Sequence, residues 1–204
     1  MINIVHNSDC LPAMKQMEDN QFDLAIVDPP YGIDIANMNM GKGSSFETGR
    51  LQKSDWDKNV PTEDYFVELK RISKNQIIWG GNYYKLGGSR CFLIWDKLDY
   101  NSDFASAELA WTSFNSVVKT FRHPRNTAEK RVHPTQKPIK LYKWLLKNYA
   151  KEGNTILDTH VGSGSSRIAC WEMGFDFTGY EIDKDYWIAQ EKRFNQIKAQ
   201  QKLF

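Results

Sequence analysis

Residues 22–31 read Phe-Asp-Leu-Ala-Ile-Val-Asp-Pro-Pro-Tyr. The first six form a short apolar run, which is typical of a strand buried on both faces of a parallel sheet. The run stops at Asp28, because neither Pro29 nor Pro30 can donate a ladder hydrogen bond. The stretch therefore predicts a central strand with a carboxylate and the ring of Tyr31 at its carboxyl end.

Six further apolar runs alternate with stretches that have the period of amphipathic helices. This alternation predicts an α/β protein with a doubly wound, seven-stranded, mostly parallel sheet. The strands are expected at Ile2–His6, Phe22–Val27, Gln76–Trp79, Cys91–Trp95, Glu108–Thr112, Thr155–Asp158 and Phe177–Glu181. The helices are expected at Cys10–Met17, Glu63–Ser73, Pro138–Tyr149, Ser165–Met173 and Lys184–Ala199.

Composition bounds the class of protein. The 204 residues are 41% hydrophobic and 25% charged, which fits one globular domain over residues 1–204. The N-terminus lacks the pattern of a signal peptide and no apolar stretch approaches about 20 residues, so we expect a cytoplasmic protein without membrane contact. Cys10, Cys91 and Cys170 are too few and too dispersed for a disulfide framework or a zinc cluster, so no metal is expected.

The charge is unevenly distributed along the chain. The net charge is +2, but residues 117–140 hold seven lysines and arginines against Glu129 alone, so this segment is +6 and the remainder is −4 (2 minus 6). Two stretches fit neither the helical nor the strand period. One is a long polar loop at 32–61, expected to be mobile, and the other is a short basic segment at 115–134.

A second motif follows the run Thr155–Asp158. Residues 158–166 read Asp-Thr-His-Val-Gly-Ser-Gly-Ser-Ser and open an expected helix, and Glu181 ends the next strand. Glycines let the backbone approach a ligand, and a carboxylate at the end of the following strand can accept hydrogen bonds from ribose hydroxyls. The paired glycines alone fit a cofactor loop and a plain tight turn equally well, and Glu181 favours a nucleoside ligand.

The tetrapeptide 28–31 suits chemistry on an amino group of a base. Such a nitrogen is a poor nucleophile because its lone pair is delocalised into the ring, and Asp28 together with the Pro29 carbonyl could accept its two N–H bonds. Pro30 forces Pro29 into an extended conformation, and Tyr31 could stack on a base flipped out of a duplex. The alternative is a proline-terminated strand with Asp28 solvated and Tyr31 covering the core.

The two motifs, in this order, resemble those of the β-class amino-group DNA methyltransferases, which modify adenine or cytosine. The resemblance covers nearly the whole chain and implies a Rossmann-like, circularly permuted methyltransferase fold. It also implies direct methyl transfer from S-adenosylmethionine (SAM), with S-adenosylhomocysteine as product. The route to carbon 5 of cytosine needs a cysteine nucleophile, usually after proline, and no cysteine follows a proline here.

The resemblance also assigns residues. Asp9, in Asn7-Ser8-Asp9-Cys10, would contact the adenine of the cofactor, although Asp there also suits a helix cap. The hexapeptide 133–138, His-Pro-Thr-Gln-Lys-Pro, resembles the motif that binds the methionine end. The catalytic residues implied are Asp28, Pro29, Pro30 and Tyr31, and the cofactor-binding residues are Asp9, Cys10, Thr135, Gln136, Lys137, Asp158, His160, Gly162, Gly164, Ser165 and Glu181.

One departure from the family pattern follows Asp158. The family usually has Pro and Phe there, whereas this chain has Thr159 and His160, which affects the shape of the methionine pocket. His160 could act as a general base, but the sulfonium is already an excellent leaving group, so packing or hydrogen bonding is favoured for its ring.

The basic segment is the expected DNA contact. Longer relatives have a target-recognition region at this place, and here it is short. Its cations would neutralise phosphates and make binding salt-sensitive, unless the segment is only a solvated charged loop. The DNA-binding residues expected are Lys119, Arg122, Arg125, Lys130 and Arg131.

The resulting hypothesis is a site-specific adenine amino methyltransferase acting on duplex DNA with a flipped target base. The leading Asp of the catalytic motif favours adenine, and cytosine amino methylation is the runner-up. RNA or protein glutamine is less favoured, since the glutamine enzymes generally carry Asn at the position of Asp28. A catalytically silent nucleic-acid-binding relative is the alternative from another class. Such compact relatives are often found in phages and prophages. A role in restriction-modification and a homodimer are further expectations.

Overall fold

The computed structural model describes residues 1–34, 57–99, 105–125, 129 and 131–201. Most of the loop expected at 32–61 lies outside these residues, as does Lys130. The described strands are β1 (Asn3–His6), β2 (Phe22–Val27), β3 (Ser73–Trp79), β4 (Phe92–Asp96), β5 (Ala107–Thr112), β6 (Lys119–Arg122), β7 (Thr155–Asp158) and β8 (Asp176–Tyr180). The helices are α1 (Cys10–Met14), α2 (Glu63–Ile72), α3 (Ile139–Tyr149), α4 (Ser165–Met173) and α5 (Lys184–Gln201).

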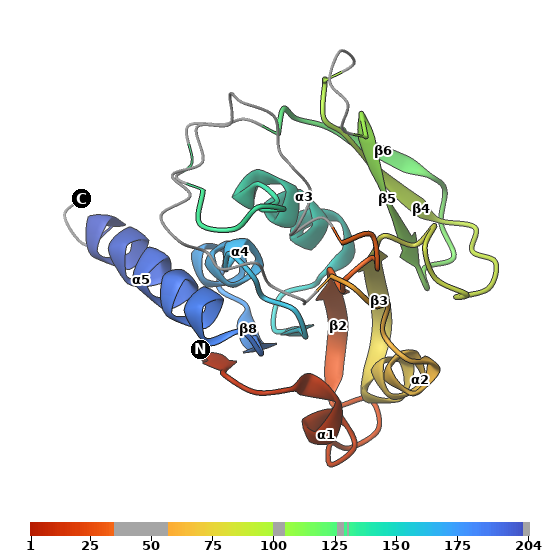
Figure 1. Ribbon diagram of the computed structural model, residues 1–204, viewed down its shortest axis with the longest axis horizontal. Coiled ribbons are helices and arrows are strands. Elements are labelled where there is room, and N and C mark those ends of the chain that lie inside the picture. Colours follow the sequence, from red (N-terminus) through yellow and green to blue (C-terminus); the bar gives the residue numbers. More distant parts are fainter. Residues whose placement is uncertain (35–56, 100–104, 126–128, 130, 202–204) are drawn as a thin grey trace.

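The strands form one eight-stranded sheet in the order β1-β8-β7-β2-β3-β5-β4-β6 (Figure 1). All neighbours pair in parallel except those of β5, which runs antiparallel to both β3 and β4. The mostly parallel sheet is therefore confirmed. β1 and β6 form its two edges.

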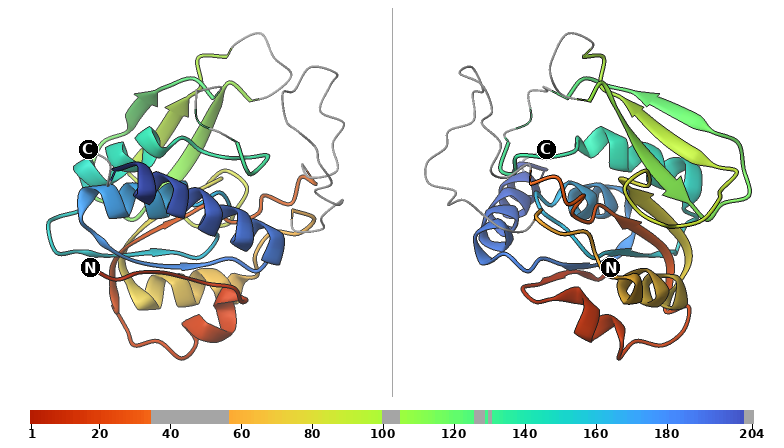
Figure 2. Two further views of the ribbon diagram at one scale, coloured as in Figure 1. Left: turned by 90° about the vertical axis from the view of Figure 1, so that its left-hand side faces the viewer. Right: turned by 45° about the vertical axis from the view of Figure 1, so that its right-hand side comes forward.

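Alternate residues of the central strand feed two separate cores. In β2, Leu24 and Ile26 point into a core shared with α3 and α4, whereas Ala25 and Val27 point into one shared with α1 and α2. This alternation follows from the two-residue period of a strand. Figure 2 shows α3, α4 and α5 on one side of the sheet and α1 and α2 on the other, which is the doubly wound arrangement expected.

Several boundaries differ from the expected ones by a few residues, and two differences matter for the packing. The expected strand count of seven was too low, because part of the basic segment forms β6, which pairs in parallel with β4. Its one large apolar side chain, Phe121, packs against the core beside Trp144, while Thr120 and Arg122 are exposed. The helix expected to reach Ser73 ends at Ile72, and Ser73 begins β3 and donates its hydroxyl to the Leu69 carbonyl (2.5 Å).

The described part of the chain contains five helices. None of them is long and apolar enough to cross a membrane. The described residues also contain no group of three or more His, Cys, Asp or Glu arranged to hold a metal ion.

Candidate active site at the carboxyl edge of the sheet

The parallel strands bring several carboxylates to one edge of the sheet. Asp9 follows β1, Asp28 follows β2, Asp158 ends β7 and Glu181 follows β8. In open parallel sheets this carboxyl edge is where ligands bind. Burial raises the pKa of the Cys10 thiol to about 12, and the charges of Asp9, Asp158 and Glu181 add to the shift. Three of the four carboxylates therefore lie around this one thiol.

A fifth carboxylate reaches this edge from the reversed strand. Because β5 runs antiparallel to β3, its first residues lie where β3 ends, and Glu108 is the second residue of β5. Lys97 follows β4 and arrives at the same edge. No local sequence pattern marks either residue as functional. Only the direction of β5, which depends on pairing with distant strands, brings Glu108 to Asp28.

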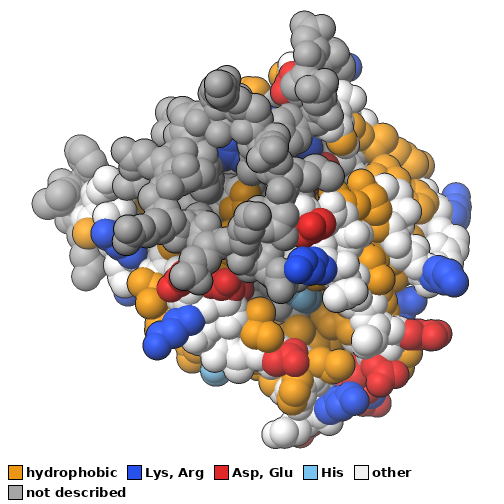
Figure 3. All heavy atoms as spheres, in the orientation of Figure 1, with side chains coloured by type: hydrophobic (Ala, Val, Ile, Leu, Met, Phe, Trp, Pro, Cys, Tyr) orange, Lys and Arg blue, Asp and Glu red, His pale blue; other side chains and the backbone are white. Residues whose placement is uncertain are grey.

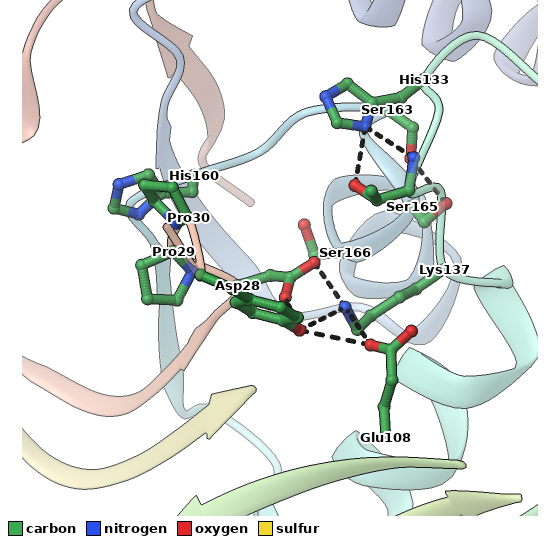
Figure 4. A network of polar contacts seen from close by, with 12 residues as sticks. Asp28, Pro29, Pro30, Glu108, His133, Lys137, His160, Ser163, Ser165 and Ser166 are labelled. Atoms are coloured by element: carbon green, nitrogen blue, oxygen red, sulfur yellow. Dashed lines mark hydrogen bonds and ion pairs between the residues drawn. The ribbon is translucent and has the colours of Figure 1, made fainter. Parts of the chain in front are cut away.

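Asp28 lies in a network of charged side chains (Figure 4). Its Oδ1 accepts a hydrogen bond from the Tyr31 hydroxyl (2.7 Å), and its Oδ2 accepts one from the Lys137 ammonium (2.5 Å). Lys137 also pairs with Oε2 of Glu108 (2.8 Å), whose Oε1 pairs with Lys97 (2.7 Å). The two carboxylates are thus matched by two ammonium groups.

The ionisation of the two carboxyls depends on these neighbours. Burial raises the pKa of Asp28, the Lys137 charge opposes that rise and the Glu108 charge adds to it. Burial alone would also raise the pKa of Glu108, but Lys137 and Lys97 outweigh it and lower the pKa to about 2. Glu108 is therefore ionised across the physiological range.

The hexapeptide 133–138 contacts both the Asp28 network and the glycine loop that follows β7. Lys137 was expected at the cofactor; its ammonium contacts Asp28, and a contact with the cofactor stays a prediction. The ring of His133 faces the cofactor loop, since a Cβ added at Gly162 would lie 3.6 Å from it, and Thr135 Oγ1 lies 3.1 Å from His133 Nδ1. Gln136 is buried and its side-chain oxygen accepts from the Val132 N–H (3.0 Å).

The two proline carbonyls have a partner that the sequence did not reveal. The Tyr84 hydroxyl donates to the carbonyl of Pro29 (2.7 Å) and lies 3.0 Å from that of Pro30. A carbonyl oxygen has two lone pairs, so Pro29 retains capacity to accept a second hydrogen bond. A buried tyrosine hydroxyl usually donates to an acceptor of this kind. The sequence around Tyr84 does not indicate which acceptor that is.

The backbone after the prolines is held by Asp57. Its Oδ1 accepts the N–H groups of Tyr31 (2.7 Å) and Gly32 (3.1 Å), and its carbonyl accepts the Asp34 N–H (3.0 Å). Asp57 is buried, with 1% of its surface exposed. The tetrapeptide is therefore fixed by a residue that follows it by 26 positions.

The ring of Tyr31 packs tightly in this arrangement. It stacks on Tyr83 with ring centroids 4.9 Å apart and planes 15° apart. Gly80, at the end of β3, has φ of +72°, and a Cβ there would overlap the Tyr31 ring. Tyr31 was expected to stack on a base, and one of its faces is here occupied by Tyr83.

The loop after β7 has the shape expected of a nucleotide loop. Asp158 accepts the His160 N–H on Oδ1 (3.0 Å) and the Ser166 hydroxyl on Oδ2 (2.6 Å), and burial raises its pKa to about 7. Gly162 and Gly164 both have positive φ, and Gly164 is the N-cap of α4. Left-handed backbone at both positions makes glycine the favoured residue there.

Glu181 holds the same loop from the neighbouring strand. Its Oε2 accepts the Gly162 N–H (2.8 Å) and its Oε1 accepts the Asp183 N–H (2.9 Å), and burial raises its pKa to about 7. A carboxylate has about four acceptor positions, so two remain for a ligand. Ser165 differs: its hydroxyl is buried and accepts from Arg193 of α5 (2.9 Å).

Thr159 and His160 form a chain of polar contacts with α2. The Tyr65 hydroxyl lies 2.6 Å from Thr159 Oγ1, which lies 2.9 Å from His160 Nδ1. The His160 ring meets the Tyr65 ring edge-on at 5.5 Å. Burial lowers the pKa of His160 to about 4, so the ring is neutral and a weak proton acceptor at neutral pH.

Asp9 has the capping position that its sequence context suggested. Its Oδ1 accepts the Leu11 N–H (3.0 Å), so it is the N-cap of α1. The carboxylate is exposed, whereas the neighbouring Cys10 is buried. The helix cap is confirmed, and contact with the cofactor stays a prediction.

Residues 78–191, more than half of the chain, match the family model described as DNA methylase, of the N6/N4 type. The chain belongs to the DNA methylase family. This methylase therefore acts on an amino nitrogen of DNA, N6 of adenine or N4 of cytosine.

Curated relatives of the methylase are type II methyltransferases. The chain is 22% identical to M2.LlaDCHI of Lactococcus lactis subsp. cremoris, over 94% of this chain and 89% of that protein. It is 24% identical to M.HinfI of Haemophilus influenzae, over 97% of this chain and 69% of that protein.

Solved structures share the fold of the methylase. The complex of M1.HpyAVI with SAM matches with a TM-score of 0.62 and 20% identity, covering 95% of this chain and all of that one. The cytosine-N4-specific PvuII DNA methyltransferase matches with a TM-score of 0.60 and 11% identity, covering 93% and 85%. The likeness covers more than nine-tenths of this chain in both comparisons and shows the fold.

The basic residues of the methylase lie in two settings. Lys119 and Arg122 are on the edge strand β6, where Arg122 is exposed and pairs with Asp96 (3.2 Å). Arg131 donates to the Pro134 carbonyl (2.6 Å), and Arg125 is half-buried. On the described surface visible in Figure 3, lysines and arginines are scattered among acidic side chains and do not form one patch.

Gly80 offers a test of how tightly Tyr31 must be held. We expect Gly80→Ala to lower methyl transfer by on the order of 10²-fold, because the new methyl group displaces the Tyr31 ring. The left-handed backbone should also cost about 1–2 kcal/mol of stability. Gly174→Ala is the matched control, since Gly174 has φ of +79° but open space around its Cβ position. It should lose similar stability and retain activity; equal activity losses in both variants would contradict the role given to Tyr31.

Proposed function

We propose that this methylase transfers the methyl group of SAM to the exocyclic amino nitrogen of adenine in duplex DNA. The observation that carries the proposal is the placement of Asp28 and the Pro29 carbonyl at the same sheet edge as the loop held by Glu181. The leading Asp of the tetrapeptide favours adenine. Cytosine is the second candidate, and a cytosine-N4-specific enzyme has the same fold.

The residues around the glycine loop fit SAM. Glu181 would accept the ribose hydroxyls, and Asp9 beside Cys10 would receive the adenine end. Gly162 and Gly164 present no side chain that would block the nucleoside, and the hexapeptide with His133 and Thr135 covers the loop where the methionine end would lie. When bound, SAM supplies a sulfonium-linked methyl group that is ready for displacement.

The tetrapeptide prepares the nucleophile. Asp28 and the Pro29 carbonyl would accept the two N–H bonds of the amino group, which directs its lone pair toward the methyl carbon. The amino group would replace the Tyr31 hydroxyl on Asp28 Oδ1, and the Tyr31 ring, still held beside Tyr83, would stack on the base with its other face. The N–C bond forms as the S–C bond breaks, and the extra proton then leaves the nitrogen for Asp28 or water.

DNA phosphates would lie along β6 and the residues after it. Lys119, Arg122, Arg125, Lys130 and Arg131 remain the proposed contacts. Arg122 would exchange its ion pair with Asp96 for a phosphate, which is feasible because 73% of its side-chain surface is exposed. Arg131 also donates to the Pro134 carbonyl, which would hold its guanidinium beside the hexapeptide while its other N–H groups meet a phosphate.

Charge removal on β6 tests this surface. We expect the double variant Lys119→Gln, Arg122→Gln to bind duplex DNA more weakly at low salt. Its plot of log affinity against log salt should be shallower by about 2, since each lost phosphate contact lowers the slope by about 0.9. Fluorescence anisotropy with a labelled duplex measures both quantities. Lys15→Gln, which removes an exposed lysine after α1, should leave the slope unchanged; an unchanged slope in the double variant would exclude β6 from the DNA interface.

The methylated base can be identified by expressing the methylase in a methylation-deficient host and sequencing the genomic DNA for modified bases. N6-methyladenine at a defined site, absent with Asp28→Ala, is the expected result. N4-methylcytosine would overturn the choice of adenine. Absence of any mark, together with no SAM binding by calorimetry, would favour the silent nucleic-acid-binding relative. Labelled SAM offered with DNA, RNA and protein in parallel would expose a different acceptor.

A further inference from the structure

The ammonium group of Lys137 is fully engaged within the protein. The residue is 3% exposed, and its three N–H bonds meet three oxygens: Asp28 Oδ2 at 2.5 Å, Glu108 Oε2 at 2.8 Å and the Tyr31 hydroxyl at 3.2 Å. The face of the Trp79 ring lies 5.4 Å away. All three N–H bonds of this ammonium are thus used within the protein, and none is left for a ligand. The group that the Lys137 charge affects is therefore the Asp28 carboxylate.

Glu108 explains how a buried lysine is kept at this place. A buried ammonium is costly unless it is paired and hydrogen-bonded. Glu108 pairs with Lys137 through one oxygen and with Lys97 through the other, and Lys97 itself lies over the Trp95 ring at 5.4 Å. Glu108 thus joins the two cations, and the four charges balance only when Asp28 is ionised.

Ionised Asp28 is what the reaction needs. A carboxylate accepts N–H bonds on both oxygens, whereas a protonated carboxyl presents a donor on one of them. Without a cation, burial and the neighbouring Glu108 charge would both favour the protonated form. Lys137 is the cation in contact with Asp28 that opposes them.

We propose that Lys137 is a positioning residue that keeps Asp28 ionised and holds its carboxylate in place to receive the amino group of the base, and that Glu108 is a positioning residue that holds Lys137. The inference rests on the proposed function, because it gives a role to Asp28 in that reaction. Lys137 supplies the charge and fixes one oxygen. Glu108 fixes Lys137.

Among the described residues, no other group near Asp28 supplies this charge. The titratable residues that face it are, besides Lys137 and Glu108, Tyr31, Tyr65 of α2, Tyr84, Tyr142 of α3 and Asp158 of β7. Burial raises the pKa of each of these tyrosines, so their rings stay neutral. Asp158 is an acid and can only oppose ionisation of Asp28.

The test compares Lys137→Met with wild type over pH 5–10. The substitution keeps an unbranched side chain one atom shorter and removes the charge, so the acidic limb of kcat/KM should move up by at least about one pH unit. Activity should recover toward alkaline pH, and SAM affinity by calorimetry should stay within about twofold. The double variant Lys137→Met, Glu108→Gln should have its acidic limb at a lower pH than Lys137→Met alone. The second change removes the negative charge of Glu108, which would otherwise disfavour ionisation of Asp28. Lys143→Met breaks a lysine–carboxylate pair outside the site and should leave the limb in place.

A second readout does not depend on activity. Carbon-13 NMR of labelled aspartate carboxyls reports the titration of Asp28 directly, with Asp28→Asn to assign the signal. An Asp28 pKa that rises in Lys137→Met and falls again in the double variant supports the inference. An unmoved titration, or a loss of kcat/KM that is equal at every pH, overturns it. If Asp28 titrates as expected but the wild type methylates no DNA, the proposed function fails and the charge network stands.

Discussion

Asp28→Ala loses methyl transfer by on the order of 10³-fold or more while still binding SAM. The magnitude is that of removing a pre-oriented polar group that acts only in the transition state. The Pro29 carbonyl, held by Tyr84, would remain as one acceptor, but the amino group would keep its delocalised lone pair. Single-turnover transfer from labelled SAM to a duplex measures the loss, and calorimetry measures SAM binding.

The control for this variant removes an equally large carboxylate elsewhere. Asp64 lies in the first turn of α2 and its side chain is 73% exposed. Asp64→Ala should transfer methyl groups at the wild-type rate. A variant at Asp28 that retained more than about a tenth of the wild-type rate would show that the carboxylate does not orient the nucleophile.

Glu181→Gln weakens SAM binding by about 10- to 100-fold. The change keeps the size of the side chain but replaces charge-assisted hydrogen bonds to the ribose by neutral ones, worth about 1.5–3 kcal/mol in total. The pKa of Glu181 is raised to about 7, so the wild-type carboxyl is ionised above that pH and protonated below it. Wild-type affinity should therefore fall as the pH drops below about 7.

The pH dependence identifies the residue responsible. Glutamine does not titrate, so Glu181→Gln should lose part of the pH dependence that the wild type shows. What remains should come from Asp158, whose pKa is also raised to about 7. Calorimetry at pH 5.5, 7 and 8.5 compares the two proteins. Equal affinities at all three values would remove Glu181 from the cofactor site.

The central part of the site was predictable because its signals are local. The buried run before Asp28 and the glycines before α4 each specify their own strand end or turn, and the structure has β2, β7 and α4 at the expected residues. Parallel strands then bring their carboxyl ends together whatever their order in the sheet. That is why Asp28 and Glu181 could be assigned to one edge from sequence alone.

The remainder depends on contacts between distant residues. The direction of β5, and with it the position of Glu108, is set by pairing with β3 and β4 and leaves no mark in the sequence. β6 escaped prediction because an edge strand exposed on both sides of Phe121 shows little apolar alternation. Lys137 was assigned by its motif to the cofactor, and only the packing of the segment before α3 turns its ammonium toward Asp28.

Asp57 has a further consequence for how this chain can change. The Asp57 carbonyl accepts the Asp34 N–H, and its carboxylate accepts the N–H groups of Tyr31 and Gly32. One residue thus holds both the end of the tetrapeptide and the backbone that follows it. Asp57 therefore couples its own position to that of the tetrapeptide, so an evolutionary change at this single residue would alter the chemistry at Asp28 without touching the tetrapeptide itself.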